Sequence, residues 1–188
     1  MLCNKRSILL LALTLSACSS TGERDLSELD QRAADITRQF VGTLLPTLQS
    51  AMAEGGPVQA IEVCSVRAPE IAAELSAESG WSVRRVSLKP RNADMAIPDS
   101  WERQMLQSFD RRQQAGEAGP EINTSAVVNG DYRYMQAQPA MPLCLSCHGQ
   151  NVSSEVRSAL AEHYPADTAT GYLAGQIRGA ISLRAELP

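Results

Sequence analysis

The 188-residue sequence lacks features that define several large classes of protein. Basic residues are not in excess, since 17 Lys and Arg stand against 21 Asp and Glu and give a formal net charge of −4, which argues against a nucleic-acid partner. No internal repeat or low-complexity tract is present, which excludes a repeat architecture. The apolar run at residues 8–15 is far shorter than the roughly 20 residues that a transmembrane helix needs, so no permanent membrane span is expected.

The N-terminus nevertheless indicates export. Lys5 and Arg6 precede the apolar run, and Leu15-Ser16-Ala17-Cys18 matches a lipobox, so residues 1–17 are predicted to be a signal peptide that is removed before Cys18. Lipid would then be added to the Cys18 thiol, followed by a lipidated linker over residues 18–25. Ser19 stands where an Asp would retain a bacterial lipoprotein in the inner membrane. We therefore expect a periplasmic protein of charge near −6 that is anchored to the outer membrane.

The most informative motif is Cys144-Leu145-Ser146-Cys147-His148, which reads C-x-x-C-H. This spacing predicts c-type haem attachment, with both thiols forming thioethers and His148 as the proximal iron ligand. A structural zinc site is an alternative, but Cys64 and His163 are single residues rather than a second ligand pair. A thioredoxin-like dithiol is another, although a Pro-flanked loop at 139–142 precedes the motif instead of a βαβ strand. Haem is the best-supported of the three.

Counting cysteines isolates one residue. Of five cysteines, Cys3 leaves with the signal peptide, Cys18 carries lipid, and Cys144 and Cys147 hold haem. Cys64 remains as a lone thiol in an oxidising compartment, which calls for an explanation.

The periodicity of the remaining chain predicts an α+β domain over residues 26–188 with an antiparallel sheet. A long amphipathic helix is expected from about Leu26 to Met52, kinked at Pro46, and a second helix from Pro57, interrupted or restarted at Pro69 and ended by Gly80. The other expected elements are a strand at 81–88, a helix that opens with a capping box at Asp99 and Glu102 and ends near Gly116, a hairpin around Asn129-Gly130, a short helix through 156–163, and a strand at 176–184.

Several of these segments together resemble a family of bacterial periplasmic haem c domains, found as stand-alone proteins and as sensor input domains. The matching runs are A-I-E-V-C at 60–64, A-P-E-I-A at 68–72, R-R-V-S-L-K-P-R-N at 84–92, P-D-S-W-E at 98–102, G-Y at 171–172 and R-G-A-I-S at 178–182. The resemblance implies a PAS-like α+β fold with a helical N-terminal part and one covalent haem. It also implies an unusual axial pair, with His148 proximal and Cys64 distal.

Alternatives remain for several residues. Cys64 is otherwise a small buried hydrophobe, and the competing distal ligands are Met95, Met105, Met135, Met141 and His163. Arg85, Arg91 and Lys89 are candidate partners of the haem propionates, or else solvated charges.

Cysteinate ligation predicts a lower reduction potential than a His/Met cytochrome has and a bond that ligand exchange can break. This favours a redox-responsive or gas-responsive sensor or binding module, with a small gas as ligand and a redox or signalling protein as partner. A membrane-tethered electron carrier is the alternative. A haem peroxidase is less well supported, because the chain offers few distal acid-base groups, so no enzymatic activity is expected.

Overall fold

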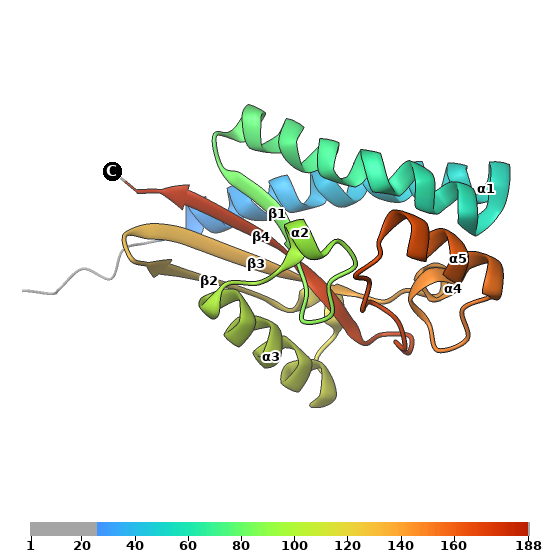
Figure 1. Ribbon diagram of the computed structural model, residues 1–188. Helices are drawn as coiled ribbons and strands as arrows, with labels where there is room; N and C mark the ends of the chain where they lie inside the picture. Colours follow the sequence, from blue (N-terminus) through green and yellow to red (C-terminus); the bar gives the residue numbers. More distant parts are fainter. Residues whose placement is uncertain (1–25, 188) are drawn as a thin grey trace, which may run out of the picture.

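The computed structural model describes residues 26–187 (Figure 1). The predicted signal peptide and the lipidation at Cys18 lie outside the described residues. The helices are α1 (Ser27–Ser79), α2 (Ala93–Ala96), α3 (Ser100–Gln114), α4 (Leu145–His148) and α5 (Ser154–His163), with short 3-10 turns at Gly119–Glu121 and Pro142–Cys144. The strands are β1 (Ser82–Val86), β2 (Asn123–Val128), β3 (Asp131–Pro139) and β4 (Ile177–Glu186).

The long helix α1 folds back on itself as a helical hairpin (Figure 1). Its backbone leaves the helical region only at Gly56, which has φ 72° and ψ −163°, a combination that glycine alone adopts at low cost. The predicted break at Gly55-Gly56 is confirmed. The predicted interruption at Pro69 is wrong, because helical dihedral angles continue through Pro69, as they do through Pro46.

The four strands form one antiparallel sheet in the order β1-β4-β3-β2. Strands β2 and β3 are joined by Asn129-Gly130, where both residues have positive φ (54° and 91°), as a two-residue hairpin turn of the I′ type requires. The central pair is β3 and β4, which are in register until a bulge between Gln138 and Pro139. The predicted hairpin is therefore confirmed.

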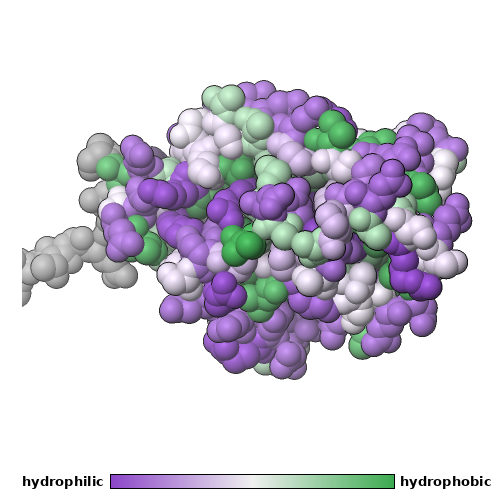
Figure 2. Space-filling model, in the orientation of Figure 1, coloured by the Kyte–Doolittle hydropathy of each residue, from purple (hydrophilic) through white to green (hydrophobic). Residues whose placement is uncertain are grey.

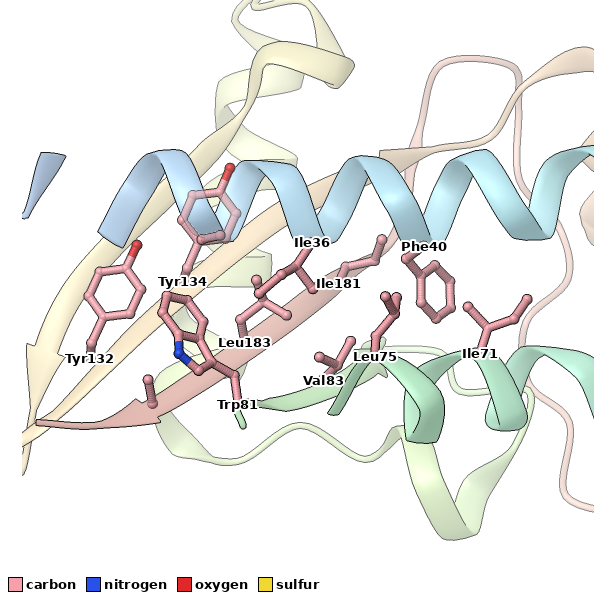
Figure 3. Close-up of a cluster of buried hydrophobic side chains, with 12 residues drawn as sticks. Ile36, Phe40, Ile71, Leu75, Trp81, Val83, Tyr132, Tyr134, Ile181 and Leu183 are labelled. Carbon is pink, nitrogen blue, oxygen red and sulfur yellow. The ribbon is translucent and has the colours of Figure 1, made fainter. Parts of the chain in front are cut away.

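Helices cover both faces of the sheet. Helix α1 packs on one face, where Ile36, Phe40, Ile71 and Leu75 contact Val83, Ile181, Leu183 and the rings of Trp81, Tyr132 and Tyr134 (Figure 3). Helix α3 packs on the other face, where Leu106 and Phe109 contact Val86, Met135 and Ala180. One antiparallel sheet with a helix on each face confirms the predicted α+β class with a helical N-terminal part.

Helix α3 begins as its sequence predicts. The Asp99 side chain accepts a hydrogen bond from Glu102 N, and the Glu102 side chain accepts one from Asp99 N, both at 2.8 Å. The short helix α2 was not predicted from sequence. It is capped by Asn92, whose side chain accepts from Met95 N.

Large apolar residues on the surface are scattered. Figure 2 shows isolated hydrophobic residues among polar ones on the face that it presents. Within residues 26–187, no helix has both the length and the apolar character that a membrane span requires.

Candidate cofactor site

The C-x-x-C-H motif lies on two short helical turns between β3 and α5. A 3-10 turn begins at Pro142, where the missing N–H and fixed φ of proline suit a helix start, and it runs into α4 without a break. Residues three apart lie on the same face of such a helix. The thiols of Cys144 and Cys147 are therefore presented together, and all three cysteines of the described chain are free thiols.

The imidazole of His148 is oriented by a backbone carbonyl. Its Nδ1 lies 2.7 Å from the oxygen of Ala169. Because a carbonyl only accepts, Nδ1 carries the proton and Nε2 keeps its lone pair, which is the arrangement typical of a metal-ligating histidine. Burial, helped by the nearby positive charges of Arg91 and Arg85, lowers the pKa of His148 to about 3, against the hydrogen bond to Ala169. The ring is therefore neutral at physiological pH, as a ligand must be.

The loop from Asp167 to Tyr172 holds the motif in place. Tyr172 N donates to His148 O at 2.9 Å, and Gly171 N donates to Gly149 O at 3.0 Å. The Tyr172 ring meets the His148 ring edge-on at a centroid distance of 6.4 Å. These contacts fix the end of α4 against a segment more than twenty residues later in the chain.

Arg91 also contacts this loop. It forms an ion pair with Asp167 at 3.2 Å, in which both side chains are largely buried. It also donates to the carbonyl oxygens of Cys147 and Ala169. Ala169 O is the acceptor of the His148 Nδ1 proton, so Arg91 supports the position of the imidazole indirectly.

Cys64 and the motif line the same cavity, which has a volume of about 280 Å³. Cys64 belongs to the second half of α1, and the cavity wall also includes Cys144, Cys147 and His148. Helix α1 contributes apolar residues to the same wall, among them Phe40, Leu44, Leu48, Ala60 and Ile61. The structure thus brings together four predicted site residues that are up to 84 positions apart in the sequence.

The electrostatic environment of Cys64 combines burial with positive charge. Burial raises the pKa of the Cys64 thiol, and the charges of Arg85 and Arg91 oppose this rise. A thiolate at this position would be stabilised by the two guanidinium groups.

The competing sulfur ligands divide into two groups. Met95 and Met141 line the cavity, whereas Met105 and Met135 belong to the α3 side of the core. His163 is exposed at the end of α5 and is not part of the cavity wall. Met52, which was not among the predicted ligands, lines the cavity as well. Its spacing of four residues from Leu48 on the amphipathic face was the signal for it.

The three candidate cations have different roles. Lys89 is not part of the cavity wall; its ammonium donates to Thr170 O and lies 4.6 Å from the centroid of the Tyr172 ring. Arg91 lines the cavity but is engaged by Asp167 and two carbonyls. Arg85 lines the cavity, and no hydrogen bond or ion pair of its side chain is found within residues 26–187.

The donor atoms do not suit a bare metal ion. Among the described residues, no three His, Cys, Asp or Glu side chains are grouped closely enough to hold one, whereas a structural zinc site needs four converging ligands. Thiols and an imidazole spread around an apolar cavity fit a larger, mostly apolar group instead. A flat macrocycle held at its edge by two thiols meets that description.

One solved structure shares the fold of this chain. The crystal structure of the cyanobacterial haem protein Tll0287 superimposes with a TM-score of 0.63 at 24% identity, covering 89% of this chain and 98% of that one. At that identity the likeness establishes the fold. The comparison with curated proteins gave no match.

The family comparison extends over most of the sequence. The profile of the Tll0287-like family matches residues 16–185, a region that contains every segment behind the resemblance to haem c domains. On this evidence, the chain belongs to the Tll0287-like family.

Proposed function

We propose that this protein binds one haem covalently through Cys144 and Cys147, with His148 and Cys64 as axial iron ligands, and acts as a redox-responsive or gas-responsive binding module. The observation that carries the proposal is that Cys64 and the C-x-x-C-H motif line one cavity. Membership of the Tll0287-like family adds support, as does the likeness in fold to a cyanobacterial haem protein.

The chain's own residues favour this assignment. His148 is neutral, with Nδ1 engaged by Ala169 and Nε2 available for a ligand. The cavity wall is largely apolar, which suits a porphyrin face. Arg85 and Arg91 supply positive charge next to Cys64, which favours the anionic form of a thiol ligand.

The proposed response depends on the bond made by Cys64. Bound haem supplies an iron that changes oxidation state, and cysteinate ligation disfavours the reduced form relative to His/Met ligation. Loss of Cys64 from its ligand position would free the second half of α1 to shift against the sheet, because the residue belongs to that helix. A redox or signalling protein would then receive the change.

We further propose that the protein acts in the periplasm, anchored to the outer membrane by lipid at Cys18. The support is the sequence of residues 1–18 and the fact that bacteria attach c-type haem outside the cytoplasm. Mass spectrometry of the membrane fraction, comparing wild type with Cys18→Ala, tests the anchor. Release of the wild-type protein without added lipid mass would contradict it.

The haem proposal is tested by absorption spectra of the purified, periplasmically expressed protein in oxidised and reduced forms. We expect a c-type reduced spectrum and a low-spin ferric spectrum typical of thiolate ligation. A midpoint potential close to that of a periplasmic electron donor, together with fast electron exchange, would instead support an electron carrier.

A further inference from the structure

Arg85 occupies an unusual position in the sheet. It belongs to β1, where it pairs with Ile181 of β4. Because strand residues alternate between faces, Arg85 shares its face with Val83, and both Val83 and Ile181 belong to the apolar cluster beneath α1. The Arg85 side chain is therefore directed toward the α1 side of the sheet, where it lines the cavity.

The guanidinium of Arg85 has no carboxylate counter-ion in the described chain. Its neighbours Arg84 and Arg91 approach Glu102 and Asp167 at 3.8 and 3.2 Å, but no ion pair or side-chain hydrogen bond of Arg85 is found within residues 26–187. Burial lowers the pKa of Arg85, because it disfavours the charged form. A partly buried guanidinium without a carboxylate beside it is favoured by an anion that enters the cavity.

The described residues around Arg85 supply no carboxylate. No Asp or Glu is among the described residues that line the cavity. The polar groups whose charges act on Arg85 are Cys64, Tyr164 and Cys144, together with Arg91. Tyr164 caps the end of α5 and also lines the cavity, and no hydrogen bond of its hydroxyl is found in the described part of the chain. The Arg85 guanidinium and the Tyr164 hydroxyl, neither of which donates a hydrogen bond within the described residues, thus line the same cavity as Cys64.

We infer that Arg85, assisted by Tyr164, forms an anion-recognition subsite in the cavity beside Cys64. The inference rests on the proposed haem binding. Two anions share the required chemistry: a propionate carboxylate of the haem itself, and a small free anion that occupies the position vacated by Cys64. Arginine suits both, since its planar fork binds anions through paired hydrogen bonds.

The first experiment tests the small anion, with azide as the probe. In ferric holoprotein carrying Cys64→Ala, azide and the neutral ligand imidazole are titrated by absorption spectroscopy, with and without Arg85→Gln. Arg85→Gln should weaken azide binding about tenfold, a typical loss for one charge-assisted contact, and leave imidazole binding unchanged. Arg38→Gln, which removes the same charge from an exposed site, should change neither.

The second experiment tests the propionate. In the Cys144→Ala/Cys147→Ala chain, where no thioether can form, the affinity for haemin is compared with that for haemin dimethyl ester. A preference for the free acid that disappears in Arg85→Gln and persists in Arg85→Lys assigns the subsite to a propionate. Thermal melting of each variant identifies any that fails to fold, in which case Arg85→Lys, which keeps the charge but loses the fork, provides the comparison.

The outcomes separate the two proposals. If Arg85→Gln weakens azide binding but not imidazole binding, the subsite binds a small anion. If Arg85→Gln abolishes the preference for haemin over its dimethyl ester, the subsite binds a propionate. Unchanged azide binding together with unchanged preference for the free acid overturns it, even though the protein binds haem. A wild-type protein with no haem spectrum would instead refute the proposed function, and the subsite with it.

Discussion

Arg91 and Asp167 form a buried ion pair at 3.2 Å behind the attachment motif. Arg91 also donates to the carbonyls of Cys147 and Ala169, and Asp167 accepts from Ala169 N at 2.8 Å. Both members of the pair thus hold the residue whose carbonyl orients His148. We interpret the pair as the support that keeps the imidazole in one orientation.

Breaking this pair should be costly. Arg91→Ala leaves the Asp167 carboxylate buried without its counter-ion, and we expect the free energy of unfolding to fall by about 3 kcal/mol. Urea denaturation measures the change. Arg38→Ala, which breaks the exposed pair with Asp35, should cost less than about 0.5 kcal/mol. Equal losses in the two variants would contradict a supporting role for Arg91.

Cys64→Ala should change the ferric absorption spectrum of the holoprotein, because the sulfur ligand is removed. We also expect the midpoint potential to rise, since a thiolate stabilises the oxidised iron. Spectroelectrochemistry measures both. Ser65→Ala is the matched control, because Ser65 is adjacent on α1 and bonds only to the backbone of its own helix at Glu62. An unchanged ferric spectrum in Cys64→Ala would rule out Cys64 as the ligand.

The thiols of Cys144 and Cys147 should hold the haem covalently. Replacing either Cys144 or Cys147 with Ala leaves one thioether, and replacing both leaves none. We expect haem to remain with the polypeptide on a denaturing gel in the wild type and to be lost from the double variant. Haem that stays attached in the double variant would show that other residues hold it.

Stability should fall in alkali because of Tyr132. Burial, together with the hydrogen bond to Asp30 at 2.7 Å, raises the pKa of Tyr132 well above its ordinary value of 10.0. The unfolded chain therefore loses this proton first, so stability is fully present below about pH 10 and declines as the pH rises further. Tyr132→Phe should flatten that decline while lowering stability at pH 7 by about 1 kcal/mol. Urea denaturation between about pH 7 and 11, a range that spans the ordinary tyrosine pKa, measures the free energy of unfolding of both proteins. If it falls equally with pH in wild type and Tyr132→Phe, Tyr132 is not responsible for the decline.

Gly179 permits the close approach of β4 to the end of β1. An added Cβ would overlap the carbonyl oxygen of Val86, so Gly179→Ala should destabilise the protein by about 2 kcal/mol. Gly42 of α1 has open space around its position, and Gly42→Ala should stabilise the helix by about 0.8 kcal/mol. Thermal melting of the two variants should therefore shift in opposite directions. If both variants shift the melting temperature in the same direction, the close approach of β4 to β1 does not require glycine at position 179.

The features that depend on neighbouring residues could be predicted from the order of residues. Local stereochemistry decides four such features, because each involves only a few consecutive positions. They are the C-x-x-C-H spacing, the capping box of Asp99 and Glu102, the Asn129-Gly130 turn and the break at Gly56. Pro69 is the local exception. Packing of α1 against the sheet, through Ile71 and Leu75, compensates for the hydrogen bond that a proline removes, and the helix continues.

Which distant residues share the cavity depends on how the helices and the sheet pack together. Cys64 and His148 are brought to one cavity by the return of α1 at Gly56 and by strand β3, which leads to the motif. No local sequence pattern predicts that these distant segments share a cavity. The same holds for the cations: Arg91 and Arg85 look equivalent in the sequence, yet Arg91 has Asp167 as its partner and Arg85 has no carboxylate partner in the described chain. Burial and counter-ions depend on what the fold places beside a side chain, which is why they could not be derived from the order of residues.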